Sequence, residues 1–193
     1  MDRLSERSSV VKEITPDIVD TLITSYQKSL KTASLSSKMY GIEKLRDRAV
    51  QELYILYCNH FISAALYQRA ENSISLLDEL LPMQPRCICH GDLSDKNILF
   101  NISREPVLID WEDAFWGIPG YDYLYWLTFF NHRKYYCKNV MQRCGLSQEL
   151  SKAVAYLILK SAISYYSGSY RNNTVDMETR ISEFIQAIGG ENE

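Results

Sequence analysis

The stretch from His90 to Asn97, which reads His-Gly-Asp-Leu-Ser-Asp-Lys-Asn, decides how the rest of this chain is interpreted. It contains the carboxylate of Asp92 and, five positions later, the amide of Asn97. A second carboxylate, Asp110, follows after thirteen more positions, in the segment Val-Leu-Ile-Asp-Trp (107–111). One acid that orients a hydroxyl and two oxygen ligands for magnesium are the groups that kinase-type phosphoryl transfer requires.

Three short apolar runs surround these polar positions. Residues 87–89 and 98–100 are two of them, and a proline introduces the third at 107–109. Short apolar runs bounded by turn residues predict strands. The loop after the first strand then carries Asp92, and the third strand ends at Asp110. Because strand ends hold side chains more firmly than free loops do, this arrangement suits a catalytic site.

Each polar residue has a predicted role in this chemistry. Asp92 accepts the proton of the acceptor hydroxyl, with Asp95 or Asp113 as the next candidates for that base. Asn97 and Asp110 hold Mg²⁺. Magnesium prefers hard oxygen ligands and keeps several waters, so one amide, one carboxylate and the nucleotide phosphates complete a site.

These motifs resemble the aminoglycoside phosphotransferase and choline kinase superfamily, which has the kinase-like fold and whose catalytic loop reads His-Gly-Asp or His-Asn-Asp. Residues 109–114 (Ile-Asp-Trp-Glu-Asp-Ala) resemble the family segment Ile-Asp-Trp-Glu-x-Ala. Residues 117–124 (Gly-Ile-Pro-Gly-Tyr-Asp-Tyr-Leu) resemble its element Gly-Asp-Pro-x-x-Asp-Leu-Ala, with Ile118 replacing the first Asp and Tyr123 inserted into the closing turn.

The resemblance implies an enzyme that transfers the γ-phosphate of ATP, or of GTP, to a hydroxyl of a small molecule with Mg²⁺ as cofactor. It places Asp92 at the acceptor and Asp110 at the metal. It also implies that Asp122 braces the catalytic loop, that His90 fixes the same loop, and that Leu99 lies under the adenine ring.

The residues that follow Asp110 are candidates for an acceptor pocket. Trp111 or Trp116, together with Glu112 and Asp113, would suit a cationic or sugar-like acceptor. The alternative is that these aromatic rings fill the core, as aromatic residues more often do. Lys96 is either a phosphate contact or a solvated loop residue, and the spacing does not decide between the two.

Two structural interpretations compete with a catalytic one. A single His-Gly-Asp is a common turn, because glycine tolerates positive φ and aspartate bonds its own backbone. The sequence Cys87-x-Cys89-His90 could indicate a soft metal site, but zinc sites usually need a second ligand pair at a defined spacing and the sequence has none. Both cysteines are therefore expected to be small core residues on one strand face.

The superfamily is bilobal, and the segment before His90 reads as helices rather than as the strands of a nucleotide lobe. Gly41 is the only glycine before Gly91, so that segment offers no glycine-rich phosphate loop. The expected fold is α+β and mostly α-helical: a kinase-like C-terminal lobe over residues 15–193, with a small antiparallel sheet that carries the catalytic loop. A flexible lead is expected over 1–14, and the N-terminal nucleotide lobe is expected to be absent.

The remaining pattern predicts helices. Thr15 is a cap residue, and Pro16 suits a first helical position, so a helix is expected to begin there. The other predicted helices cover residues 42–68, as one long helix or a pair, 74–81, 123–130, 148–166 after a Ser147 cap, and a last segment from Thr174.

Composition fits one globular domain. Of the 193 residues, 46% are hydrophobic and 23% are charged, which suits a soluble folded chain. The net charge of -3 offers no field that would attract nucleic acid or an anionic membrane, and no apolar run is long enough to span a membrane. Five scattered cysteines, an odd number, suit a reducing compartment. A cytoplasmic protein is therefore expected.

Three functions stay open at this point. The first is a phosphotransferase of which this chain is the catalytic lobe, with the nucleotide lobe encoded upstream or on another chain. The second is a non-catalytic binding or regulatory module, and the third is a truncated, inactive relic. The chain alone is expected to bind ATP weakly. The face that lacks a nucleotide lobe is expected to favour self-association or a partner chain.

Overall fold

The computed structural model describes residues 13–30, 39–169 and 177–189. In this part of the chain the α-helices are α1 (Pro16–Leu30), α2 (Ile42–Cys58), α3 (Ala64–Ser75), α4 (Leu77–Leu80), α5 (Tyr121–Leu127), α6 (Lys138–Met141), α7 (Gln148–Ser169) and α8 (Met177–Gly189). The short 3₁₀ turns are η1 (Leu81–Met83), η2 (Asp95–Asn97), η3 (Phe130–Tyr135) and η4 (Gln142–Cys144). The strands are β1 (Cys87–Cys89), β2 (Ile98–Phe100), β3 (Pro106–Leu108) and β4 (Phe115–Gly117).

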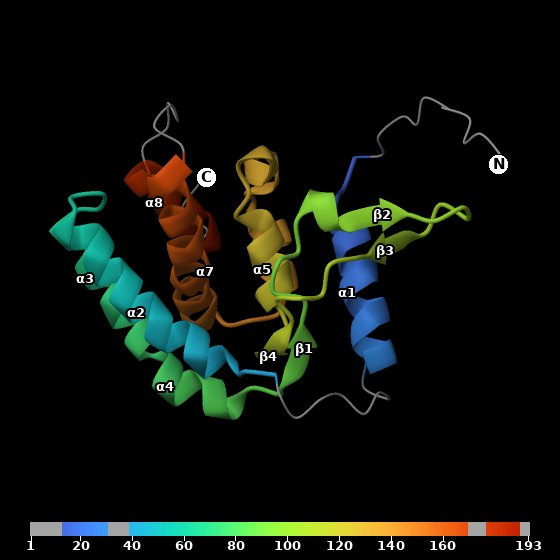
Figure 1. Cartoon of the computed structure of the whole chain (residues 1–193), viewed down its shortest axis with the longest axis horizontal. Helices are drawn as coiled ribbons and strands as arrows, with labels where there is room; N and C mark the ends of the chain where they lie inside the picture. The colour runs from blue at the N-terminus through green and yellow to red at the C-terminus, as the bar shows by residue number, and fades with distance from the viewer. Residues whose placement is uncertain (1–12, 31–38, 170–176, 190–193) are drawn as a thin grey trace.

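Helices α2, α3, α7 and α8 form a bundle on one side of the segment between β1 and α5 (Figure 1). Helix α7 packs against α2, α3 and α8, and also against α5. Helix α5 lies between this bundle and the strands, while α1 packs on the far side against α5, β1 and β3. Helices from both ends of the chain therefore pack beside the segment between β1 and α5.

The helix starts follow local sequence signals. Helix α1 begins at Pro16, as predicted, because proline lacks the N–H that a first helical position leaves unpaired. The segment predicted as one long helix or a pair is a pair. Helix α2 ends at Cys58, His60 adopts a φ of 59°, and the hydroxyl of Ser63 accepts the N–H of Leu66 to cap α3.

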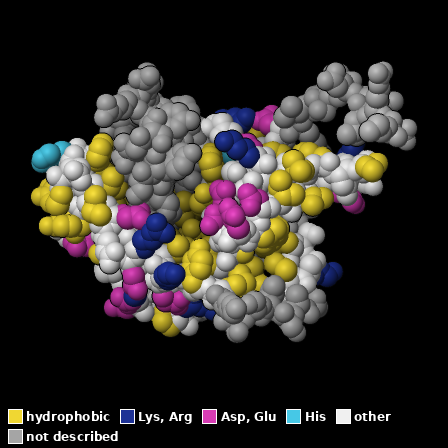
Figure 2. Space-filling model, viewed as in Figure 1, with side chains coloured by type: hydrophobic (Ala, Val, Ile, Leu, Met, Phe, Trp, Pro, Cys, Tyr) yellow, Lys and Arg dark blue, Asp and Glu magenta, His cyan; other side chains and the backbone are white. Residues whose placement is uncertain are grey.

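The strands form two separate antiparallel pairs in the described chain, where the sequence predicted one small sheet. Strand β1 pairs with β4, and β2 pairs with β3. Strand β4 was not predicted, because Phe115-Trp116-Gly117 is short and its residue types do not alternate between apolar and polar. In the structure Phe115 and Gly117 are buried and Trp116 is exposed. Hydrophobic side chains remain on the surface over the β2–β3 hairpin (Figure 2).

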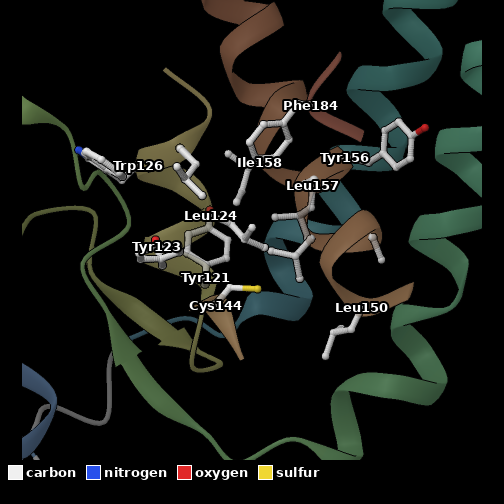
Figure 3. Packing of buried hydrophobic residues seen from close by; sticks show 14 of the residues in the cluster. Tyr121, Tyr123, Leu124, Trp126, Cys144, Leu150, Tyr156, Leu157, Ile158 and Phe184 are labelled. Atoms are coloured by element: carbon white, nitrogen blue, oxygen red, sulfur yellow. The ribbon is translucent and has the colours of Figure 1, made fainter. Parts of the chain in front are cut away.

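Helix α5 is the centre of the hydrophobic core (Figure 3). It is short, but nearly every side chain on it is buried. Burial of aromatic and aliphatic side chains on several sides fixes both its rotation and its height relative to α7. The buried cluster labelled in Figure 3 contains Tyr121, Tyr123, Leu124 and Trp126 of α5, Leu150, Tyr156, Leu157 and Ile158 of α7, Phe184 of α8, and Cys144.

The two ends of the chain are described only in part. Residues 1–12 of the expected lead lie outside the described residues, but Glu13 forms an ion pair with Lys134 and Ile14 is buried. Ser147 precedes α7 and accepts the N–H of Leu150, as predicted for a cap. Thr174, the expected start of the last helix, is outside the described residues. No described helix is long and apolar enough to cross a membrane.

Candidate active site

The carboxylate of Asp122, at the start of α5, holds the beginning of the loop of residues 90–97, which is named the catalytic loop after its predicted role. It accepts the backbone N–H of His90 at 2.8 Å and that of Gly91 at 3.0 Å. It also accepts the hydroxyl of Tyr26 from α1 at 2.5 Å. Burial raises the pKa of Asp122, and these three donors act in the opposite direction. Two backbone groups that would otherwise be unpaired are thus satisfied inside the protein.

Gly91 lets two backbone segments approach each other closely. Its φ is +86°, and a Cβ atom there would lie 2.2 Å from the carbonyl oxygen of Asp113. Only glycine accepts both the left-handed conformation and this close approach. The loop that starts at His90 is therefore held against the segment that follows Asp110.

The His90 ring links the same two segments. Its Nε2 lies 2.8 Å from the carbonyl oxygen of Ile109, and its Nδ1 accepts the N–H of Asp92 at 3.3 Å. These bonds assign the ring proton to Nε2, because a carbonyl oxygen only accepts. Trp111 packs edge-on against His90 at 4.7 Å and against Tyr26 at 5.2 Å, so its ring is part of the loop support.

Both carboxylate oxygens of Asp92 are hydrogen-bonded. Oδ1 accepts the hydroxyl of Tyr125 at 2.8 Å, and Oδ2 accepts the side-chain amide of Asn97 at 3.0 Å. The same amide also donates to the backbone oxygen of Asp92 at 2.8 Å. The structure therefore brings Asp92 and Asn97 into direct contact, as the sequence spacing suggested.

Asn97 is buried and its amide nitrogen is committed to Asp92, so its Oδ1 is the atom that remains for a cation. The backbone oxygen of Asn97 accepts the N–H of Ile109 at 3.1 Å. Asp110 follows immediately, with a φ of 64° and an exposed side chain. An amide oxygen and an exposed carboxylate on adjoining backbone segments fit the donor set that magnesium accepts.

Asp95 is turned away from this site. Its carboxylate accepts Trp126 Nε1 at 2.8 Å, the amide of Asn131 at 3.0 Å, and His132 Nε2 lies 3.1 Å away. Burial opposes ionisation of Asp95, but the bonds from His132, Trp126 and Asn131 outweigh it and hold the pKa below its usual range. A carboxylate committed to three partners is a poor second candidate for the base. Asp95 is better described as an anchor of η2.

The other predicted site residues are exposed. Leu99 lies on β2 with half of its surface accessible, and Lys96 is exposed on η2. Glu112 and Asp113 are also exposed. Figure 2 shows acidic side chains gathered near the middle of the same face. Such a surface attracts cations rather than anionic groups.

Sequence reasoning missed Tyr125, although a signal existed. Tyr125 stands three residues after Asp122, and residues three apart on a helix share one face. Since Asp122 was expected to contact the catalytic loop, Tyr125 could have been expected there too. Tyr26 carries no comparable signal, because it lies 96 residues before Asp122 on another helix.

Of the two cysteines expected in the core, Cys89 is buried there, whereas Cys87 is only half-buried at its edge. Cys89 is buried with its Sγ 3.4 Å from the carbonyl oxygen of Ile118, and burial raises the pKa of its thiol. Among the described residues no group of three or more His, Cys, Asp and Glu side chains could hold a metal ion. A magnesium site built from Asn97, Asp110 and nucleotide phosphates would not be counted among such groups. Only Asp110 is one of these four residue types, because the other ligands are an amide and the phosphates.

Comparisons with known proteins find similarity over parts of this chain. The phosphotransferase enzyme family matches residues 42–135, which contain the catalytic loop and Asp122. Choline kinase from Cryptosporidium parvum Iowa II has a similar fold, with a TM-score of 0.52 at 16% identity. The likeness covers 88% of this chain and 63% of that choline kinase. A search of curated proteins found no match. At this identity the structural likeness shows the fold alone, and the family match covers just under half of the chain.

Proposed function

We propose that this chain, which resembles the aminoglycoside phosphotransferase and choline kinase superfamily in its motifs and its fold, is the catalytic lobe of a small-molecule phosphotransferase. The reaction is transfer of the γ-phosphate of ATP, or of GTP, to a hydroxyl group. One observation carries the proposal. Asp92 and Asn97 share hydrogen bonds, and the backbone that leads to Asp110 is bonded to Asn97.

Each residue has a role that its surroundings support. Asp92 orients the acceptor hydroxyl and takes its proton, because its carboxylate is fixed at the loop and only partly buried. Asn97, through Oδ1, and Asp110 would hold Mg²⁺. When bound, the ion neutralises charge on the phosphates during transfer. His90 and Asp122 hold the loop so that these groups keep their places.

The rest of the site follows from the same assignment. Residues 15–193 would form the kinase-like C-terminal lobe. Leu99 would lie under the adenine ring, because it is an exposed apolar side chain two residues after Asn97. Exposed Glu112 and Asp113 would face the acceptor. The protein is proposed to act in the cytoplasm.

One observation favours an additional partner. On the β2–β3 hairpin and its continuation, four large apolar side chains are exposed: Leu99, Ile102, Val107 and Ile109. An apolar surface of this kind beside a nucleotide site would be covered by a nucleotide lobe, a partner chain or a second copy. A non-catalytic module or an inactive relic would keep the same surface but would not transfer phosphate.

Two substitutions separate chemistry from cofactor binding. We expect Asp92→Asn to lower turnover by about 10² to 10⁴ while Mg-ATP binding stays nearly unchanged, because the proton acceptor is lost and the proposed metal ligands Asn97 and Asp110 remain. We expect Asp110→Ala to weaken Mg-dependent ATP binding itself. Turnover would be followed with labelled ATP and a panel of hydroxyl acceptors, and binding by calorimetry, with the chain alone and with a nucleotide lobe supplied.

The control is Asp17→Asn, an exposed carboxylate on α1 that should leave both measurements unchanged. For the chain alone, weak Mg-ATP binding is expected, because contacts from a nucleotide lobe are missing. If Asp92→Asn kept normal turnover in an active complex, the assignment of the base would be wrong. If no acceptor were phosphorylated by any complex, the non-catalytic alternative would replace the proposal.

A further inference from the structure

One face of α5 contacts the catalytic loop at three successive points. Asp122 accepts two backbone N–H groups at the start of the loop, Tyr125 donates to Asp92, and Trp126 donates to Asp95. These three residues stand at positions i, i+3 and i+4 of a helix, so they share one face. The loop is therefore aligned residue by residue against a single rigid element.

The middle contact differs from the other two, because it reaches the proposed catalytic group itself. The hydroxyl of Tyr125 lies 2.8 Å from Oδ1 of Asp92, while the amide of Asn97 lies 3.0 Å from Oδ2. A carboxylate bonded at one oxygen alone can still turn about its broad terminal torsion. A carboxylate bonded at both oxygens, from two different elements, keeps one orientation.

We propose that Tyr125 is a positioning residue, whose hydroxyl and the amide of Asn97 together fix the orientation of the Asp92 carboxylate. The effect of Tyr125 on phosphoryl transfer rests on the proposed function, whereas its effect on the orientation of the carboxylate does not. Each oxygen of Asp92 has a second lone pair, so an acceptor hydroxyl can still donate to the carboxylate without displacing Tyr125.

The phenol is well suited to this role because its own position is fixed. Its ring stacks with Tyr121 at 6.3 Å and meets Phe129 edge-on at 5.7 Å, both between ring centroids. A tyrosine has few torsions to immobilise, so little entropy is lost in holding it. Burial and the neighbouring Asp92 carboxylate raise the pKa of Tyr125, so its oxygen keeps the proton that it donates.

The orientation can be measured without ATP or any acceptor. In the full chain labelled with ¹⁵N, the side-chain amide of Asn97 reports on its bond to Asp92 through the rate at which its protons exchange with water. We expect Tyr125→Phe to raise that exchange rate about tenfold, because the carboxylate loses its second hydrogen-bond donor and turns.

The matched control is Tyr136→Phe. Tyr136 is also half-buried, but its hydroxyl donates to the carbonyl oxygen of Leu127, away from the loop. This control should destabilise the fold to a similar degree and leave the Asn97 amide unchanged. Equal effects of Tyr125→Phe and Tyr136→Phe on that amide would overturn the inference, since both would then act through general stability.

A second measurement reads the same bond from its other end, in case Tyr125→Phe does not fold. With ¹³C at the ring carbon that bears the hydroxyl, the exchange of the Tyr125 hydroxyl proton is visible as an isotope shift. We expect slow exchange in the unaltered chain and at least tenfold faster exchange in Asp92→Ala. The same exchange rate in both chains would show that Tyr125 does not donate to Asp92.

Where a phosphotransfer assay exists, the two parts of the inference separate. Tyr125→Phe should lower kcat about tenfold and leave KM for Mg-ATP unchanged, because Tyr125 contacts the base rather than Asn97 or Asp110. A raised KM with normal kcat would assign Tyr125 to nucleotide binding instead. If the unaltered protein showed no phosphotransfer, the proposed function would be refuted. The exchange measurements would then still test the orientation of the Asp92 carboxylate.

Discussion

The catalytic loop is held at both ends by a carboxylate, but in different surroundings. Asp122 is only 2% exposed and accepts two backbone N–H groups and the hydroxyl of Tyr26. The side chain of Asp95 is 36% exposed and is bonded by the side chains of Trp126, Asn131 and His132. Water can reach one anchor and cannot reach the other.

The difference teaches which end of the loop depends more on its anchor. A donor whose buried acceptor is removed is left unpaired, whereas water can take the place of an acceptor that is itself partly exposed. The pKa values of the two carboxylates are also shifted in opposite directions, because burial raises the pKa of Asp122 while hydrogen bonds lower that of Asp95. Four experiments test this contrast, beginning with the largest expected effect.

Removal of the buried carboxylate of Asp122 should cause the largest loss in the free energy of unfolding. Asp122→Ala leaves the hydroxyl of Tyr26 and the N–H groups of His90 and Gly91 without an acceptor, and we expect a loss of about 3 to 5 kcal/mol in the free energy of unfolding. Urea denaturation followed by circular dichroism measures it. Asp17→Ala, which removes an exposed carboxylate paired with an exposed arginine, should cost less than about 0.5 kcal/mol. A comparable loss in both variants would contradict the contrast.

The buried end can also be strained through its glycine. Gly91→Ala places a methyl group against the carbonyl oxygen of Asp113 and forces alanine to adopt a φ of +86°. We expect a loss of about 2 to 4 kcal/mol, again from urea denaturation. The control is Gly145→Ala, where φ is +71° but no atom lies within 4 Å of the added methyl. That variant should lose only about 1 kcal/mol, so the difference isolates the close approach.

Removal of the partly exposed carboxylate of Asp95 should cause a smaller loss in the free energy of unfolding. We expect Asp95→Ala to lower the free energy of unfolding by about 1 to 2 kcal/mol, because water replaces part of what its three partners lose. Hydrogen exchange should show faster opening at η2 than at Gly91. A loss as large as that of Asp122→Ala would mean that the exposed anchor is not solvated in the way the structure indicates.

A fall in pH should change the contributions of Asp95 and Asp122 to stability in opposite directions. The folded pKa of Asp95 lies below its unfolded value near 3.8, so its contribution is complete above that value and is lost as pH falls through the folded pKa. The folded pKa of Asp122 is raised, so its share of stability grows as pH falls from that raised value toward 3.8.

Urea midpoints of the unaltered chain and of Asp95→Asn, measured from about pH 6 to about pH 3, isolate the first of these effects. The asparagine does not titrate, so the two curves should converge in acid. Curves that stay parallel down to about pH 3 would show that the Asp95 carboxylate is not stabilised in the folded state.

The sequence by itself determined the features that depend on neighbouring residues. The start of α1 at Pro16, the apolar runs that became β1, β2 and β3, and the spacing of Asp92 from Asn97 all follow from short-range patterns. The mostly helical fold with small antiparallel sheets follows from the same patterns, as does the resemblance to the superfamily.

Tertiary structure alone decided the partners of these residues. The contact of Tyr26 with Asp122 joins residues 96 positions apart, and it exists because α1 packs against α5. The sequence leaves the carboxylate of Asp95 as a candidate for the base, whereas in the fold that carboxylate is bonded to three distant partners. Periodicity within one segment fixes which face of a helix is apolar, but the side chains that the face meets depend on how distant segments pack, and no local pattern contains that information.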